Sequence, residues 1–370
     1  MRRGHRRGPR AASAALRRPH PCPGGGADSV TTSRYAAAGV DLHAADVAKA
    51  RIGELVAATR TPLSVGEVGA FGGMVRIPAG MQRPVLVMST DGVGTKVLVA
   101  QQAGRHDSVG EDLVNHSVND ILVHGATPIA FMDYIAGHRL PVEMIAGVVE
   151  GIARGCRAHG MALAGGETAQ MPGVYAEGTF DLAGTIIGVV EEDRAIHGEA
   201  IRPGDVLVAL ASTGLHTNGY TLARQVLQDV MGLALDAPVP GTSTPLVDAL
   251  LAVHQSYAAA LAPVLDRVHG LAHITGGGIA GNLVRVLPAG VEAIIDPGSW
   301  QWPTLFRVIA EGGSISLEEM RDVFNLGVGM IAVTAPDDLA AVESSAAAVG
   351  ITTWRMGEVR TGSRRVLFAD

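Results

Sequence analysis

The sequence predicts an α+β protein, mixed α/β in the order of its elements, that is built as two domains. The chain has 370 residues, more than one ordinary core requires. Short apolar runs typical of strands alternate with segments whose apolar residues recur at helical spacing, and hairpin-like connections occur beside helical ones. We therefore expect two mixed sheets, each with helices packed on one face.

Composition excludes several classes of protein. Hydrophobic residues make up 47% of the chain and charged residues 18%, the opposite of a disordered sequence. Two cysteines, Cys22 and Cys156, are too few for a disulfide framework or a cysteine zinc site. Since no apolar run reaches the roughly 18 residues of a membrane-spanning helix, we expect a cytoplasmic protein that does not bind membranes.

Charge is distributed unevenly along the chain. Residues 1–33 contain seven arginines and one acid, so the remaining residues carry a net charge of −13. We interpret residues 1–33 as a disordered arginine-rich extension, with an organelle-targeting or anion-binding arm as the alternative. The acidic remainder should repel nucleic acid. A phosphorylated ligand would therefore need helix N-termini, backbone amides or metal ions.

The first domain is expected over residues 34–200, where each element follows from its apolar spacing. Helical spacing predicts helices, the first of which ends before Pro62, and short continuous apolar runs predict strands. In chain order we expect a helix at 46–59, a glycine-rich stretch at 65–75, a strand at 84–89, a helix at 109–123, a strand at 129–135, a helix at 142–159, a strand at 162–164 that enters a Gly165–Gly166 turn, and a strand at 180–190.

The second domain is expected over residues 201–370, after a turn at 201–205. The same two patterns predict its elements. In chain order we expect a strand at 206–211, a helix at 220–231, a proline-rich linker at 237–245, a helix at 246–268, a glycine turn at 276–278 with a helix through Val286, and strands at 291–295 and 328–334.

The turn after the strand at 84–89 reads STDGVGTK, from Ser89 to Lys96. The strand delivers Asp91 to a loop in which two glycines let the backbone approach a ligand, and Mg²⁺ prefers carboxylate oxygens. Lys49 and Lys96 are the only lysines, and a lysine at this turn suits phosphate as a compact point charge. An ordinary turn with a solvated Asp-Gly is the alternative.

Polar residues share one face of the expected helix at 109–123. At 3.6 residues per turn, Asp112, Asn115, His116 and Asn119 lie on one side, with Asp120 at its margin. Such a face could hold metal ions, and the alternative is a polar stripe that faces solvent.

Two further segments carry groups suited to ligand binding. Residues 164–173, AGGETAQMPG, lead from a glycine pair to an acid and a hydroxyl, which indicates a loop that wraps a ligand. Residues 212–220, STGLHTNGY, offer Thr217 or Asn218 as a helix N-cap with free N–H groups for phosphate. His216 would lie at the mouth of that site, either as a structural residue or as an acid.

These segments occur in a fixed order along the chain: STDGVGTK, VNDILVHGATP, FMDY, GGETAQMPG, GLHTNGY, HITGGG, SWQWP and FNLGVGM. In this set and order the chain resembles the phosphoribosylformylglycinamidine cyclo-ligases, also called aminoimidazole ribonucleotide synthetases, from about residue 35 onward. The resemblance implies a homodimer that pairs through its N-terminal sheets. It also implies that ATP and Mg²⁺ bind beside the first domain, with a monovalent cation such as K⁺ as a further candidate. The implied reaction closes the imidazole ring of formylglycinamidine ribonucleotide with release of ADP and phosphate.

The resemblance also implies roles for particular residues. The implied metal ligands are Asp91, Asp120 and Glu167. The implied ATP-binding residues are Gly92, Val93, Gly94, Thr95, Lys96, Gly165, Gly166 and Thr168. The implied substrate-binding residues are His216, Thr217, Asn218, Gly219, Thr275, Gly276, Gly277 and Gly278. The candidate catalytic residues are His216, His273 and Lys96.

The chain departs from the family's pattern at three places. Gly53 stands about where many relatives have a lysine thought to lie near ATP, and Asn115–His116 stand where smaller or apolar residues are common. Gly281 stands where an acid often precedes Asn282. Two other interpretations stay open: another ATP-dependent enzyme of this superfamily, such as thiamine-monophosphate kinase, and a non-catalytic nucleotide-binding module.

Overall fold

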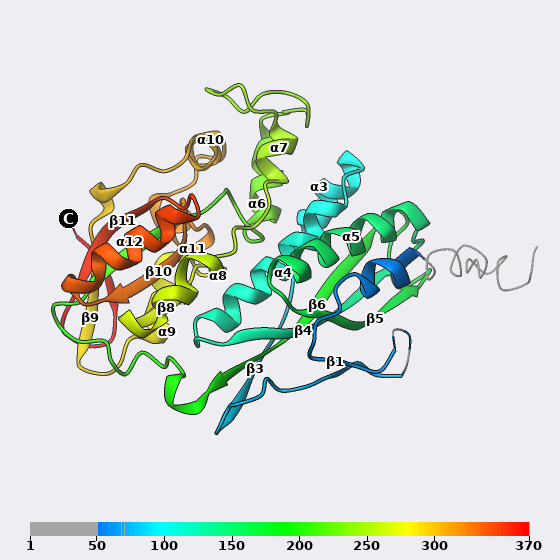
Figure 1. Ribbon diagram of the computed structural model, residues 1–370. Coiled ribbons are helices and arrows are strands. Elements are labelled where there is room, and N and C mark those ends of the chain that lie inside the picture. The colour runs from blue at the N-terminus through cyan, green and yellow to red at the C-terminus, as the bar shows by residue number, and fades with distance from the viewer. Residues whose placement is uncertain (1–50, 68, 70, 370) are drawn as a thin grey trace, which may run out of the picture.

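The computed structural model describes residues 51–67, 69 and 71–369 (Figure 1). The extension at 1–33 and the first part of the helix expected at 46–59 lie outside these residues, and residues 51–57 are helical. Within the described part of the chain, no helix is both long enough and apolar enough to cross a lipid bilayer.

The first sheet has four strands in the order β3-β6-β4-β5, with β4 and β5 parallel and the other neighbours antiparallel. Helices α3, α4 and α5 lie on one side of it, as expected (Figure 1). The expected glycine-rich stretch at 65–75 runs from β1 to β2, and these two short strands pair antiparallel. The bounds are β1 (Ser64–Val65), β2 (Met74–Val75), β3 (Pro84–Gly92), α3 (Lys96–Ala103), α4 (Asp107–Leu122), β4 (Thr127–Gly137), α5 (Val142–Ala158), β5 (Ala162–Gln170) and β6 (Phe180–Glu191).

The second sheet has six strands in the order β12-β9-β11-β7-β10-β8, and β12 runs parallel to β9 while the other neighbours are antiparallel. The strands are β7 (Val206–Ala211), β8 (Val268–His273), β9 (Val291–Ile295), β10 (Val328–Thr334), β11 (Thr353–Thr361) and β12 (Val366–Phe368). The helices are α6 (Tyr220–Arg224), which continues as a π-helix over Gln225–Val230, α7 (Leu246–Leu250), α8 (Ala258–Leu261), α9 (Gly278–Val286), α10 (Thr304–Gly313), α11 (Leu317–Val323) and α12 (Leu339–Ala348).

Apolar side chains cover both faces of the second sheet, so the expectation of helices on one face fails there. Val208 of β7 packs in one core with α8 and α12, while its neighbour Leu207 packs in another with α9. The physical reason is that β7 and β10 are apolar at nearly every position, the pattern of a strand buried on both sides.

One apolar core runs from the first domain into the second. Val97 and Val99 of α3 belong to the same buried cluster as Leu250 of α7 and Phe306 of α10. In Figure 1, α3 lies beside α6 and α7. The two sheets are therefore joined through a packed layer of helices.

The helix expected at 246–268 is wrong in its middle. α7 ends at Leu250, α8 spans only Ala258–Leu261, and the chain between them is irregular. The apolar spacing is helical, but backbone groups of residues 252–257 bond side chains of α3 and α4 instead. Tertiary hydrogen bonds thus override the local pattern.

The Gly165–Gly166 turn is also wrong, because β5 continues through both glycines to Gln170. Gly166 pairs with Asp133 of β4. A Cβ at Gly166 would lie 2.3 Å from Asp133 Oδ1, whereas one at Gly165 would meet nothing within 4 Å. Gly166 therefore makes room for a neighbouring carboxyl, and the pair does not form a loop around a ligand.

Candidate functional site

The polar face of α4 is buried against the second domain. Asp112 Oδ1 accepts a hydrogen bond from His254 N at 2.7 Å, and Asn115 Nδ2 donates to His254 O at 2.8 Å. Asn119 Nδ2 donates to Gln255 O at 2.8 Å, and its Oδ1 accepts from Tyr257 N at 2.9 Å. These three side chains of α4 therefore bind the backbone of the irregular segment at 252–257 and do not face solvent.

Lys96 reinforces this contact from the first turn of α3. Its Nζ lies 2.7 Å from Asp112 Oδ2 and donates to Ala252 O at 2.7 Å. The side chain is 0% exposed. Burial lowers the pKa of Lys96, and Asp112 beside it opposes that shift. The Lys96 ammonium is therefore directed at Asp112 and the backbone of Ala252, and its contact with ATP phosphates stays a prediction.

Two carboxylates and an imidazole meet next to this contact. His116 Nε2 of α4 lies 2.9 Å from Asp91 Oδ2, at the end of β3, and 3.6 Å from Asp120 Oδ2, one turn along α4. Ser89 Oγ donates to Asp120 Oδ2 at 2.9 Å. Burial opposes charge on His116, but the hydrogen bond with Asp91 and the charge of Asp120 outweigh it and raise the pKa of His116.

The second domain completes the group with two histidines and a threonine. His273 Nδ1, at the end of β8, lies 2.8 Å from Asp120 Oδ1, and its Nε2 lies 3.1 Å from His254 Nε2. Thr217 Oγ1 lies 2.7 Å from His116 Nδ1 and 3.4 Å from His254 Nδ1. A continuous chain of hydrogen bonds therefore crosses the junction from Asp91 to Asp120.

His216 lies next to this series of hydrogen bonds and is not part of it. Its ring stacks on His254, with centroids 3.9 Å apart, and its Nε2 accepts from Thr213 N at 3.3 Å. Burial, followed by the nearby His273 and Lys96, lowers the pKa of His216 well below its ordinary value. His216 is therefore packed inside the junction, which differs from the predicted position at the mouth of a site.

A cavity of ≈ 530 Å³ opens at the domain junction. It brings Asp91 and Asp120 of the first domain together with His273 and Thr275 of the second. Asn282 and Arg285 of α9 also line it, and sequence reasoning missed both. The spacing of Asn282 and Arg285 could have indicated them, because residues three apart lie on the same face of the helix that follows the HITGGG turn.

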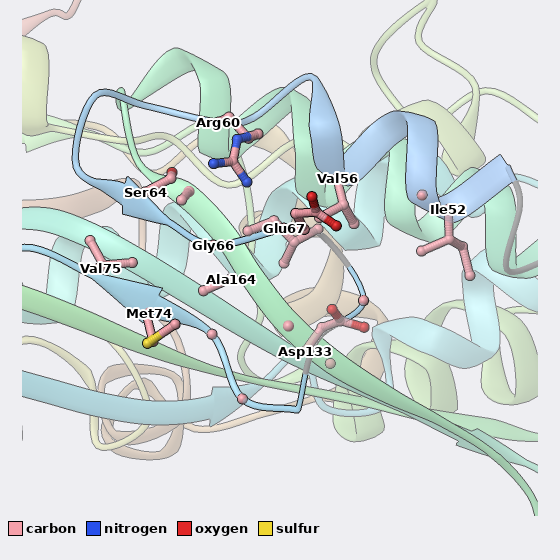
Figure 2. A pocket seen from close by; sticks show the side chains of 18 of the residues that line it. Ile52, Val56, Arg60, Ser64, Gly66, Glu67, Met74, Val75, Asp133 and Ala164 are labelled. Atoms are coloured by element: carbon pink, nitrogen blue, oxygen red, sulfur yellow. The ribbon is translucent and has the colours of Figure 1, made fainter. Parts of the chain in front are cut away.

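A second cavity of ≈ 570 Å³ lies in the first domain, between the helix at 51–57, the β1–β2 hairpin and β5 (Figure 2). Ile52 and Val56 form an apolar wall, and Arg60, Glu67 and Asp133 supply polar groups. Burial raises the pKa of Asp133 to about 7. Sequence reasoning missed Asp133, although it stands in the FMDY segment.

Comparison with known proteins gives the family. Residues 72–190 match the AIR synthase related protein, N-terminal domain, and residues 202–370 match its C-terminal domain. The chain is 50% identical to the phosphoribosylformylglycinamidine cyclo-ligase of Myxococcus xanthus (strain DK1622) over 331 residues, which are 89% of this chain and 96% of that protein. It is 47% identical to the protein of the same name from Sorangium cellulosum (strain So ce56), over 88% and 94% of the two chains.

The chain belongs to the phosphoribosylformylglycinamidine cyclo-ligase family. Solved structures of other proteins share the fold of this cyclo-ligase family member. A thiamine-monophosphate kinase from Stenotrophomonas maltophilia K279a is 17% identical, with a TM-score of 0.63 over 87% of this chain and 94% of that one. Hydrogenase maturation protein HypE, in a structure with ATP, is 18% identical, with a TM-score of 0.61 over 85% and 88%.

Not all the residues that the cyclo-ligase resemblance implies come together. Asp91 pairs with Gly184, Gly184 with Asp133, and Asp133 with Gly166, so two strands separate Asp91 from the strand of Glu167. Three inter-strand spacings of about 4.8 Å lie between β3 and β5, so the separation is roughly 14 Å. Within this chain Asp91 and Asp120 form a pair, while Glu167 lines the other cavity with Gly165, Gly166 and Thr168.

The remaining predicted residues lie at the junction without lining either cavity. Val93 is buried between Gly92, which ends β3, and Gly94, which lies before α3, and Thr95 Oγ1 lies 3.0 Å from Thr221 Oγ1. Asn218 Oδ1 accepts from Gly276 N at 3.1 Å, which links the two predicted substrate segments. Gly219, Gly277 and Gly278 have positive φ angles of 75°, 93° and 62°, so they permit the tight turns that begin α6 and α9.

We predict that Lys96→Met lowers the free energy of unfolding by about 3–5 kcal/mol, because it leaves Asp112 buried without its cation. Urea denaturation at pH 7 measures this. Lys96→Met/Asp112→Asn should recover much of the loss, since an amide oxygen still accepts from His254 N. Arg105→Met breaks the half-exposed Arg105–Asp248 pair and should cost less than about 1 kcal/mol. Equal losses for Lys96→Met and Arg105→Met would contradict the role of Lys96.

Proposed function

We propose that this protein is an ATP-dependent cyclo-ligase that converts formylglycinamidine ribonucleotide to aminoimidazole ribonucleotide in purine biosynthesis, with release of ADP and phosphate. The observation that carries the proposal is the junction cavity, where Asp91 and Asp120 of one domain face His273 and Thr275 of the other. The relatives that are 50% and 47% identical bear the name of this activity.

The chemistry explains why such a cavity needs groups from both domains. The formyl oxygen of the substrate is a poor leaving group until it accepts the γ-phosphoryl group of ATP. The amidine nitrogen then attacks the formyl carbon, the C–O bond breaks, and the oxygen departs with phosphate and takes the bonding electrons. The nitrogen loses its proton as the aromatic ring forms. The protein therefore has to align nitrogen with carbon and to offset phosphate charge.

Asp91 and Asp120 are the residues that we propose as metal ligands at the junction. Their Oδ2 atoms both approach His116 Nε2, and both residues line the junction cavity. Carboxylate oxygens are ligands that Mg²⁺ accepts. A cation held there would offset the charge of a transferring phosphoryl group.

The cavity of the first domain is the proposed site for ATP. Gly165, Gly166 and Thr168 line it together with the apolar wall of Ile52 and Val56, which suits the flat face of a base. Gly53 also lines it, and Arg60 is a cation at this cavity in a chain that lacks the usual lysine at residue 53 (Figure 2). HypE, which has a similar fold, is described in complex with ATP.

The second domain is the proposed site for the substrate's ribose phosphate. Arg285 provides a planar cation that suits phosphate. Asn282 Nδ2 donates to Gly278 O at 2.8 Å and to Thr275 O at 3.2 Å, so it holds the turn in place at the start of α9. Asn218 Nδ2 is buried without a partner among the described residues. It is thus a donor available for substrate.

A homodimer is proposed because the first sheet has an apolar outer face. Met88 and Leu86 of β3 are 65% and 45% exposed, and Met132 of β4 is 38% exposed. A second copy of the chain would bury this face. The cytoplasmic location and the use of a monovalent cation such as K⁺ stay predictions.

The activity is tested with purified protein, ATP, Mg²⁺ and formylglycinamidine ribonucleotide. Equal amounts of ADP and aminoimidazole ribonucleotide should form, and Asp120→Asn should lower turnover at least about 100-fold because a metal ligand is lost. Asp337→Asn, which changes an exposed acid outside both cavities, should keep normal turnover. Production of ADP without ring closure would instead indicate a kinase-like enzyme.

The dimer is tested by light scattering after gel filtration. Met88→Glu should run as a monomer at concentrations where the unmodified chain is a dimer, because it would place a charge in the proposed interface. Val230→Glu is the matched control, since Val230 is 64% exposed and lies on the π-helix after α6. If both variants remain dimeric, the outer face of the first sheet is not the interface.

A further inference from the structure

The junction contains a mixed cluster of nitrogen and oxygen ligands. Asp91 Oδ2 lies 2.9 Å and Asp120 Oδ2 3.6 Å from His116 Nε2, while Asp120 Oδ1 lies 2.8 Å from His273 Nδ1. Ligand atoms of His116, Asp120 and His273 all lie within 4.8 Å of one another. Two imidazoles and the Asp120 carboxylate, from both domains, thus surround a single point, and Asp91 contacts one of these imidazoles.

This donor set differs from the one that Mg²⁺ favours. Mg²⁺ is a hard cation that takes oxygen ligands and keeps several waters, whereas imidazole nitrogen suits cations such as Zn²⁺ and Co²⁺. We propose that His116, Asp120 and His273 form a site for one transition-metal dication, with both imidazoles as ligands and Asp91 beside His116. This inference rests on the proposed role of Asp120 as a metal ligand and specifies which cation it holds.

The groups that contact the other ring nitrogens of His116 and His273 are arranged to support metal binding. With a cation on His116 Nε2, the Nδ1–H of that ring donates to Thr217 Oγ1, 2.7 Å away. With a cation on His273 Nδ1, its Nε2–H donates to His254 Nε2 at 3.1 Å, and His254 Nδ1–H donates in turn to Thr217 Oγ1 at 3.4 Å. Both ligand nitrogens therefore present lone pairs to the same point, with their other nitrogens satisfied, as in established metal sites.

A second group of histidines nearby is less suitable. His216, His254 and His273 also bring nitrogen atoms together. However, His216 Nε2 accepts from Thr213 N at 3.3 Å and from Gln255 N at 3.5 Å. Its lone pair is occupied by backbone groups, so His216 supports the packing of His254 and is not a ligand.

The test is a titration of the full chain with Co²⁺ in the absence of nucleotide, followed by visible absorption, with Zn²⁺ added in competition. One equivalent of Co²⁺ should bind and produce the absorption of nitrogen-coordinated Co²⁺, which Zn²⁺ should displace. His116→Met should weaken binding by at least about 100-fold, and Thr217→Val by about 10–100-fold, because Thr217 orients the ligand.

The matched control is His269→Met. His269 Nδ1 lies 2.7 Å from Asp205 Oδ2, so this pair has the same histidine–carboxylate contact without a second carboxylate. The control should bind Co²⁺ like the unmodified chain. Circular dichroism and gel filtration check that His116→Met is folded, and His273→Asn replaces it if it is not.

Two results would overturn the proposal: Co²⁺ affinity unchanged by the loss of His116 and of His273, or a bound Co²⁺ spectrum without nitrogen ligands. Binding is read without ATP or substrate, so it is independent of turnover. A chain that binds Co²⁺ as described but does not close the ring would contradict the cyclo-ligase activity and leave the metal site standing.

Discussion

The buried contact between α4 and the segment at 252–257 is the interaction on which the rest of the structure depends. It holds an ion pair, Lys96–Asp112, at 0% exposure, and burying two charges is costly unless other hydrogen bonds satisfy them. Here Asp112 also accepts from His254 N, and Lys96 also donates to Ala252 O. The pair is therefore part of a network that joins the two domains.

This contact determines the geometry of the site. Because α4 holds the backbone around His254, the chain leaves the helical path, passes through α8 and enters β8, which ends at His273 beside Asp120. The helical repeat of α4 lets it both bind the second domain and place side chains at the junction cavity. Asp112 and Asn119 bind the second domain, while His116 and Asp120, one turn apart, approach Asp91 and the junction cavity. Neither domain alone contains all the groups that meet at this part of the junction.

Much of the sheet structure could be predicted from the sequence, because buried strands are short apolar runs with clear ends. The predicted bounds of β7, β9 and β10 agree with the structure. The helix at 246–268 and the Gly165–Gly166 turn failed because distant residues decide them. Side chains of α3 and α4 bind the backbone of 252–257, and the carboxyl of Asp133 requires a glycine at residue 166.

The candidate site could be predicted only in part, again because contacts between distant residues determine the rest. The motifs named Asp91 and Asp120, both of which contact His116, yet the separation of Glu167 from them follows from strand order, which no local pattern contains. The burial of Lys96 and the approach of His254 to His273 likewise depend on how the two domains pack.

Native-state hydrogen exchange of residues 252–257 tests the central claim most directly. If α4 holds this segment, the amides of His254 and Tyr257 exchange slowly, although they lie outside any helix or strand, and Asn119→Ala accelerates exchange at Tyr257. Exchange at both amides as fast as in an exposed loop, and unchanged by Asn119→Ala, would contradict the account.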